Sequence, residues 1–67
     1  MDDKFVDLHT EIKNLLPRRK VESIDDVDDD IVVVIKTGGR AMDIQEERQV
    51  KMLIFQMYGK MGKVKVC

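Results

Sequence analysis

The sequence predicts a small α+β domain, an α-β-β-α unit in which two helices pack on an antiparallel hairpin. Three observations predict this class: an amphipathic run over residues 3–16, a run of β-branched residues over 31–35 that precedes two glycines, and a second amphipathic run over 45–58. Because the chain has 67 residues, we expect one domain over 1–67. A core of this size supplies roughly 3–5 kcal/mol, so pairing with another chain is a common way to stabilise such a domain.

Residues 3–16 have the periodicity of an amphipathic helix. Their apolar side chains fall within an arc of about 100° around the helix, with acidic and amide side chains opposite. The apolar set comprises Phe5, Leu8, Ile12, Leu15 and Leu16. Asp2 and Asp3 can cap the free N–H groups of the first turn. Pro17 ends the helix, because proline disfavours helical geometry at the residue before it.

Residues 17–30 are expected to be irregular. The stretch 21–24 is compatible with a short strand, but it runs into a segment with six acidic residues between Glu22 and Asp30. Close like charges repel, and aspartate forms strands and helices poorly. The sequence therefore predicts a solvated loop for the acidic run.

Residues 31–35 give the strongest strand signal of the chain, because all five are β-branched. Gly38-Gly39 follow, and a two-residue hairpin turn of the primed type needs positive φ at both central positions. A turn at these glycines would pair Ile35 with Met42 and gather the apolar residues on one hairpin face. We therefore expect a hairpin in which residues 40–44 return along 31–37.

A second helix is expected over about residues 45–58. Asp43 and Glu46 have the spacing of a capping box, an interpretation that competes with Asp43 as the end of the returning strand. Gly59 or Gly62 can end the helix. Its core stripe is predicted to be Val50, Leu53, Ile54, Met57 and Met61. Residues 63–66 alternate lysine and valine, which indicates a short C-terminal edge strand guarded by its lysines.

No catalytic or cofactor motif is recognisable. The segment 37–40, Thr-Gly-Gly-Arg, matches neither a phosphate-binding loop nor a dinucleotide fingerprint, and a hairpin turn explains both glycines. His9, the one histidine, has no partner in the sequence that would orient it as a base. Cys67 has no preorganised surroundings that would activate a thiol. We therefore expect a protein that is not an enzyme and has no cofactor.

A metal site is not expected either. Asp26, Asp28 and Asp30 have the alternate spacing that opens a calcium loop. Such a loop then needs glycine at its sixth position and glutamate at its twelfth, where this chain has Ile31 and Thr37.

Basic residues offer one functional hypothesis. Arg18, Arg19 and Lys20 could contact phosphates, joined by the lysines near the C-terminus, Lys60, Lys63 and Lys65, if the fold brings both groups together. A net charge of −1 and the acidic run weigh against a dedicated nucleic-acid binder. Aromatic residues for base stacking are also scarce. A nucleic-acid-associated regulator is therefore the alternative function.

Surplus apolar faces favour a different function. Met52 and Phe55 lie opposite the core stripe of the second helix, and Val32 and Val34 lie on the second hairpin face. A two-layer domain buries one face of each element, although the first helix and the C-terminal strand could wrap around to cover these positions. We therefore expect a non-enzymatic protein-binding module, a regulator, adaptor or inhibitor, that acts as a homodimer.

Further contacts and the location follow from charge and cysteine usage. Asp28 and Asp29, in the acidic run, are candidate electrostatic contacts for the partner. No segment reaches the ~20 apolar residues of a membrane span, and the acidic N-terminus does not resemble a signal peptide. A terminal Cys67 cannot be the prenylated cysteine of a C-a-a-X tail, and a lone free thiol fits a reducing compartment. We expect a cytoplasmic protein.

Overall fold

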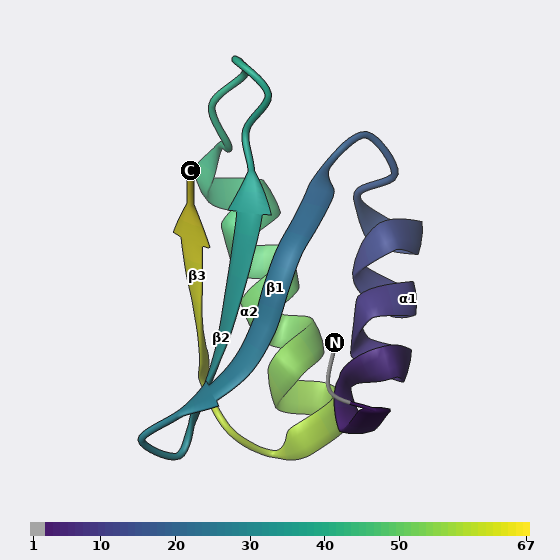
Figure 1. The fold of residues 1–67 in the computed structure, drawn as a ribbon, viewed down its shortest axis with the longest axis vertical. Coiled ribbons are helices and arrows are strands. Elements are labelled where there is room, and N and C mark those ends of the chain that lie inside the picture. Colours follow the sequence, from purple (N-terminus) through teal and green to yellow (C-terminus); the bar gives the residue numbers. More distant parts are fainter. Residues whose placement is uncertain (1–2) are drawn as a thin grey trace.

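The computed structural model describes residues 3–67 and confirms the α+β class. A 3-10 turn over Asp3–Phe5 leads into α1 (Val6–Leu15), followed by β1 (Lys20–Val27), β2 (Asp30–Lys36), α2 (Ile44–Tyr58) and β3 (Gly62–Val66). The strands form one sheet in the order β1-β2-β3, with β1 antiparallel and β3 parallel to β2 (Figure 1). The expected α-β-β-α order and the C-terminal edge strand are both present. No helix within residues 3–67 is long and apolar enough to cross a membrane.

Both helices pack on the same face of the sheet. Alternate residues of β2 (Ile31, Val33 and Ile35) point to this face and are almost completely buried. They join a single core cluster with side chains of α1, α2 and β1, namely Phe5, Leu8, Ile12, Leu16, Val21, Ile24, Val50 and Ile54. Figure 1 shows the sheet crossing in front of α2, with α1 beside it. Among residues 3–67, no helix lies against the opposite sheet face, which we call the open sheet face.

The predicted hairpin across Gly38-Gly39 is wrong in its second strand. The two glycines do form a turn, with φ of 61° and 86°, and the Arg40 N–H donates to the Thr37 carbonyl at 3.1 Å. Residues 40–43, however, leave the sheet and lead into α2. Both edges of β2 are already occupied, one by β1 and the other by β3, and the Thr37 N–H donates to the carbonyl of Cys67 at 3.0 Å.

The acidic run is also not a loop, contrary to the prediction. Asp25 and Asp26 belong to β1 and pair with Val32 and Ile31 of β2. A two-residue turn at Asp28-Asp29 then reverses the chain, and both aspartates have positive φ, 52° and 68°. The hairpin therefore forms on the N-terminal side of β2.

Lysines from distant parts of the chain explain how a strand tolerates this charge. Lys4 forms a hydrogen-bonded ion pair with Asp26 and lowers the pKa of that carboxyl. Lys63 of β3 lies 3.4 Å from Asp30, and Lys60 donates to the backbone carbonyl of Asp29 at 3.2 Å. These contacts offset the like-charge repulsion that the sequence alone indicates.

The capping residues predicted from the sequence are confirmed for α2 but not for the start of α1. Asp43 accepts a hydrogen bond from the Glu46 N–H at 2.8 Å, and Glu46 accepts from the Asp43 N–H at 3.3 Å, so the capping box is confirmed. Gly59, with φ of 71°, ends α2. The N-cap position of α1 is Phe5, without a side-chain hydrogen bond, so the predicted cap by Asp3 is wrong, and Asp2 lies outside the described residues.

The predicted core stripe of α2 is correct for its first half. Val50 and Ile54 are fully buried, and Leu53 packs at the margin of the core. Met57 is exposed. Met61 is also exposed, because the helix ends at Tyr58 and the helical periodicity does not extend to this residue.

Replacement of Asp29 with glycine should stabilise the protein by about 0.5–1 kcal/mol. Positive φ strains a residue with a Cβ, and Asp-Gly is a preferred pair for a primed hairpin turn. Chemical denaturation would measure the change. As a control, Asp25→Gly, in the extended part of β1, should destabilise the protein. Equal effects of both substitutions would contradict the turn assignment.

Candidate functional site

A buried arginine organises the end of the sheet at which β2 leads to α2. Arg19, in the turn between α1 and β1, is 5% exposed. Its Nε and Nη2 atoms donate to the two carboxylate oxygens of Glu46, each at 2.9 Å. This is the bidentate fork geometry that makes arginine–carboxylate pairs strong and directional.

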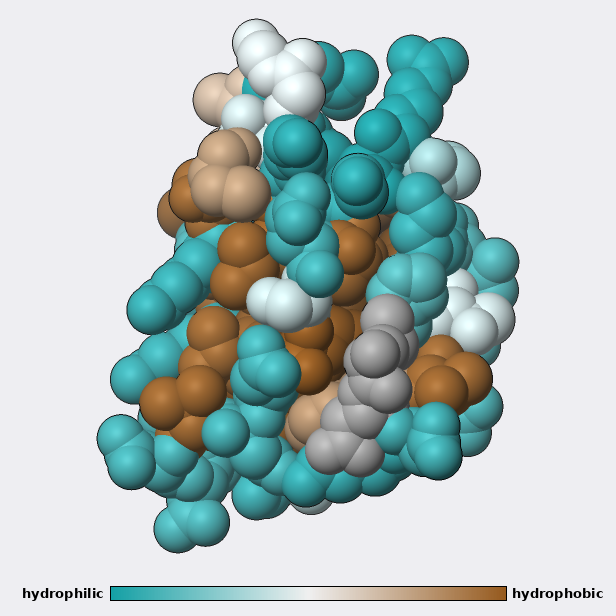
Figure 2. All heavy atoms as spheres, in the orientation of Figure 1, coloured by the Kyte–Doolittle hydropathy of each residue, from teal (hydrophilic) through white to brown (hydrophobic). Residues whose placement is uncertain are grey.

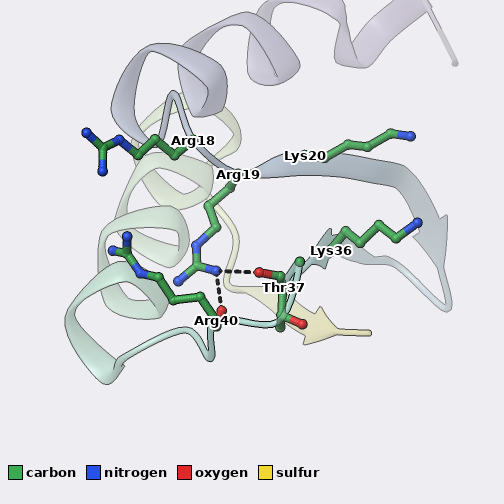
Figure 3. Close-up of a pocket in the computed structure, with 7 residues that line it drawn as sticks. Arg18, Arg19, Lys20, Lys36, Thr37 and Arg40 are labelled. Carbon is green, nitrogen blue, oxygen red and sulfur yellow. Dashed lines mark hydrogen bonds between the residues drawn. The ribbon is translucent and has the colours of Figure 1, made fainter.

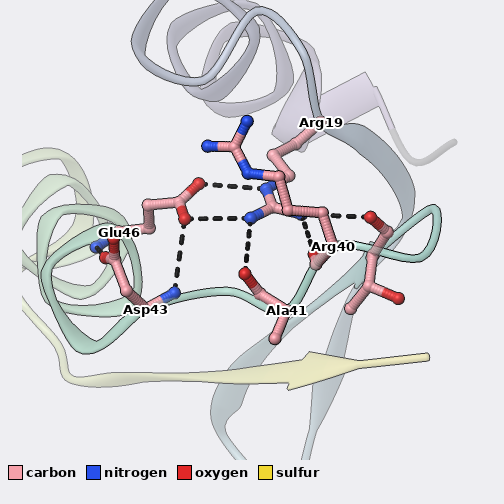
Figure 4. Close-up of polar contacts among 6 residues, drawn as sticks. Arg19, Arg40, Ala41, Asp43 and Glu46 are labelled. Atoms are coloured by element: carbon pink, nitrogen blue, oxygen red, sulfur yellow. Dashed lines mark hydrogen bonds and ion pairs between the residues drawn. The ribbon is translucent and has the colours of Figure 1, made fainter.

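The same guanidinium also binds three backbone carbonyls of the β2–α2 loop. Nη1 donates to the carbonyls of Thr37, at 3.1 Å, and Arg40, and Nη2 donates to that of Ala41 at 2.9 Å (Figure 4). The carbonyl of Arg19 itself accepts from Lys13 Nζ at 2.6 Å. We call this set of contacts the Arg19 anchor. The side chain of Arg19 binds the β2–α2 loop and the first turn of α2, and its backbone carbonyl binds α1.

The anchor stays ionised over a wide pH range. The hydrogen bonds from Arg19 lower the pKa of Glu46 from 4.5 to about 2, with smaller contributions from the Asp43 N–H and the charge of Arg40. The Glu46 hydrogen bond likewise raises the pKa of Arg19. All donors of Arg19 therefore serve the fold, which separates it from Arg18 and Lys20, its exposed neighbours in the predicted basic triplet.

Exposed cations surround a pocket of about 270 Å³ beside the anchor. Its lining consists of Arg18, Arg19, Lys20, Lys36, Thr37, Gly38 and Arg40 (Figure 3). We call the four exposed cations among them, Arg18, Lys20, Lys36 and Arg40, the cationic rim. Figure 3 shows the two arginines reaching to one side of the anchor and the two lysines to the other.

Sequence reasoning found half of this rim. Arg18 and Lys20 belong to the predicted basic triplet, whereas Lys36 and Arg40 do not. Lys36 joins because β1 pairs with β2 in a register that places it opposite Lys20. Arg40 joins because the loop folds back onto Arg19. Both depend on long-range pairing, for which the sequence carries no local signal.

The C-terminal lysines do not gather at the rim. Lys60 and Lys63 contact the acidic end of the sheet through Asp29 and Asp30. Lys65 lies on the open sheet face beside Val34 of β2. The condition under which these three lysines would join the basic triplet, that the fold brings both groups together, is therefore not met.

The predicted partner-binding residues lie in three separate places. Met52 and Phe55, on the outer side of α2, are 56% and 55% exposed. Asp28 and Asp29 form the β1–β2 turn.

Val32 and Val34 point to the open sheet face. Val32 is only 8% exposed, with Asp25 and Lys63 beside it on the neighbouring strands, so its side chain offers little surface for the predicted contact. Val34 is half-buried. Figure 2 shows apolar atoms gathered in the middle of the face in view, with hydrophilic side chains around them. Of the four apolar candidates, Met52 and Phe55 thus offer the most accessible surface.

The remaining titratable residues that could bind a metal ion or act in catalysis are Tyr58, His9, Cys67 and the acidic residues. Within residues 3–67, no group of three histidine, cysteine or acidic side chains is placed to hold a metal ion. The Tyr58 hydroxyl donates to the Lys4 carbonyl at 3.0 Å, and its ring meets Phe5 edge-on at 5.8 Å. Desolvation raises the pKa of this hydroxyl. His9 is half-buried on α1, and Cys67 is exposed.

Comparisons with known proteins find no matching family model, no matching curated protein and no matching solved structure.

Acid should weaken the Arg19 anchor between pH 4.5 and about 2. A carboxyl whose pKa is lower in the folded than in the unfolded state contributes stability above the unfolded value, and that contribution is lost as the pH falls through the folded one. Glu46→Gln should therefore be less stable at neutral pH but lose less stability across this window. Denaturation midpoints measured from pH 7 to 2 would check this, since the other carboxyls titrate in both proteins. Parallel pH curves would contradict the assignment.

Proposed function

We propose that this protein is a non-enzymatic, cytoplasmic protein-binding module, a regulator, adaptor or inhibitor, and that it pairs with a second copy of itself through α2. The observation that carries the proposal is the exposure of Met52 and Phe55, each more than half accessible. Residues three apart on a helix are surface neighbours, so the two side chains make one continuous apolar contact. We call Arg48, Met52 and Phe55 the α2 face.

A second copy complements this face well. If two α2 helices pack antiparallel about an axis midway between Met52 and Phe55, each Met52 lies over the partner's Phe55. Sulfur–aromatic contacts of this kind are favourable. The same arrangement brings Arg48 to the C-terminal end of the partner's α2, where carbonyl groups favour a cation and where this helix has no basic residue in its last turn.

The β3 edge is a less suitable surface for self-pairing. Lys63 and Lys65 project on the same side of β3. In an antiparallel pair of β3 strands, these lysines would face the lysines of the other copy, and like charges directly opposite destabilise a sheet. Charged edge strands of this type are a common protection against edge-to-edge association.

The expected dimer is weak. Complete burial of an apolar side chain contributes roughly 1.5–3 kcal/mol, so the half-exposed Met52 and Phe55 of two copies add about 3–6 kcal/mol. A dissociation constant of about 1 mM corresponds to about 4 kcal/mol. Assembly would then depend on local concentration. The acidic turn at Asp28-Asp29 stays free at the far end of the sheet as a contact for a basic segment of another protein.

Phe55→Asp should abolish self-association, because it places a charge in the apolar contact. Sedimentation equilibrium up to about 1 mM protein should give a mass that rises with concentration for the original chain and stays monomeric for the variant. Val6→Asp is the matched control, since Val6 on α1 is 49% exposed, and it should dimerise like the original chain. A monomeric mass for the original chain throughout this range would overturn the homodimer, and equal loss in both variants would move the interface away from α2.

A further inference from the structure

We propose that the cationic rim binds the phosphate backbone of duplex nucleic acid without reading its sequence. The site lies at the end of the sheet away from the acidic turn, next to the Arg19 anchor. The proposal is independent of self-association through α2, because no residue of the α2 face belongs to the rim.

The rim has an excess of positive charge. Arg19 in the pocket is neutralised by Glu46, which leaves Arg18, Lys20, Lys36 and Arg40. Glu22 lies 3.9 Å from both lysines. Four cations against Glu22 and Asp43, whose charge acts on the neighbouring Arg19, leave a net positive charge, and neither arginine of the rim has an ion pair within residues 3–67.

The acidic run does not cancel this charge. The turn at Asp28-Asp29 lies at the opposite end of β2, whose seven residues span about 20 Å at roughly 3.3 Å per residue. Salt at physiological concentration screens exposed charges beyond about 8 Å. In addition, Lys4, Lys60 and Lys63 contact the acidic end directly. A net charge near zero therefore conceals a cationic end that a polyanion can recognise.

The arrangement of the rim fits a chain of phosphates better than a single anion. The arginines and the lysines reach to opposite sides of the anchor and do not converge on one point (Figure 3). Successive phosphates of a backbone likewise present separate charges, and arginine binds phosphate oxygens in a bidentate manner. Gly38, which lines the pocket, and its neighbour Gly39 are exposed and have no side chain to keep a backbone at a distance.

The absence of aromatic residues from the rim favours a duplex over a single strand. Proteins that hold single strands stack bases on aromatic side chains. The three aromatic residues of this chain lie elsewhere, with Phe5 buried in the core, Tyr58 packed on it and Phe55 on the α2 face. Contacts limited to phosphates position a duplex but do not specify its sequence.

Fluorescence anisotropy with short labelled duplexes of RNA and of DNA tests the proposal directly. The logarithm of the binding constant should fall linearly with the logarithm of salt concentration, with a slope of about −3 for three to four phosphate contacts. Arg18→Gln, Arg40→Gln and Lys36→Gln should each make the slope shallower by about 1 and weaken binding to all sequences alike. The matched control is Lys60→Gln, which removes the same charge at the acidic end and should leave the slope unchanged.

Four outcomes would overturn the proposal. These are no binding at low salt, an equal loss in Lys60→Gln, binding restricted to single strands, and displacement of the duplex by pyrophosphate at equivalent phosphate concentration, which would indicate a site for a small anion. Arg18 and Arg40 donate no side-chain hydrogen bond within residues 3–67, and Lys36 has only an exposed ion pair with Glu22, so the three variants should fold, and circular dichroism would verify that they do. Comparison of the binding constants for the RNA and the DNA duplex shows which of the two is preferred.

Discussion

One buried arginine determines how the second half of this chain folds. After β2, the glycine turn could send the chain back along the sheet as a hairpin. The guanidinium of Arg19 instead binds the carbonyls of Thr37, Arg40 and Ala41 and holds Glu46 at the start of α2. The chain therefore crosses over as a helix, and β3 pairs with the edge of β2 that a returning strand would have occupied. Since a buried charge without partners is costly, a path of the chain that left Arg19 without these acceptors would be destabilised.

The sequence predicts the helices and strands better than it predicts which strands pair with each other. Periodicity identifies both helices and the strand at 31–35, and the capping box locates the start of α2, because these signals are local. The pairing of β2 is not local. Gly38-Gly39 carry the stronger hairpin signal, whereas the true hairpin turn uses Asp28-Asp29, two residues whose charges suggest a loop. Only the lysines that the fold brings to this end, Lys4, Lys60 and Lys63, show why a strand is tolerated there.

The same long-range contacts decide which residues are available for function. Arg19, the central residue of the basic triplet, is buried and donates all its hydrogen bonds within the fold. Lys36 and Arg40 are the additional cations at the surface. Two of the lysines that sequence reasoning would add to the triplet, Lys60 and Lys63, instead contact the acidic end. The result is a domain with separated charges and with apolar side chains on the outer side of α2, which supports the two surfaces that we propose, one for a second copy and one for a polyanion. Neither surface depends on residues of the other, so the two proposals can fail separately.

A double-mutant cycle on the Arg19 anchor tests this account most directly. The free energy of unfolding would be measured for the original chain, Arg19→Met, Glu46→Met and the double variant. Each single substitution leaves the other charge, buried in Arg19 and half-buried in Glu46, without its ion-pair partner, so the loss in the double variant should be much smaller than the sum of the two single losses. Additive losses would show that Arg19 and Glu46 contribute independently, which would contradict the account of the anchor as one unit.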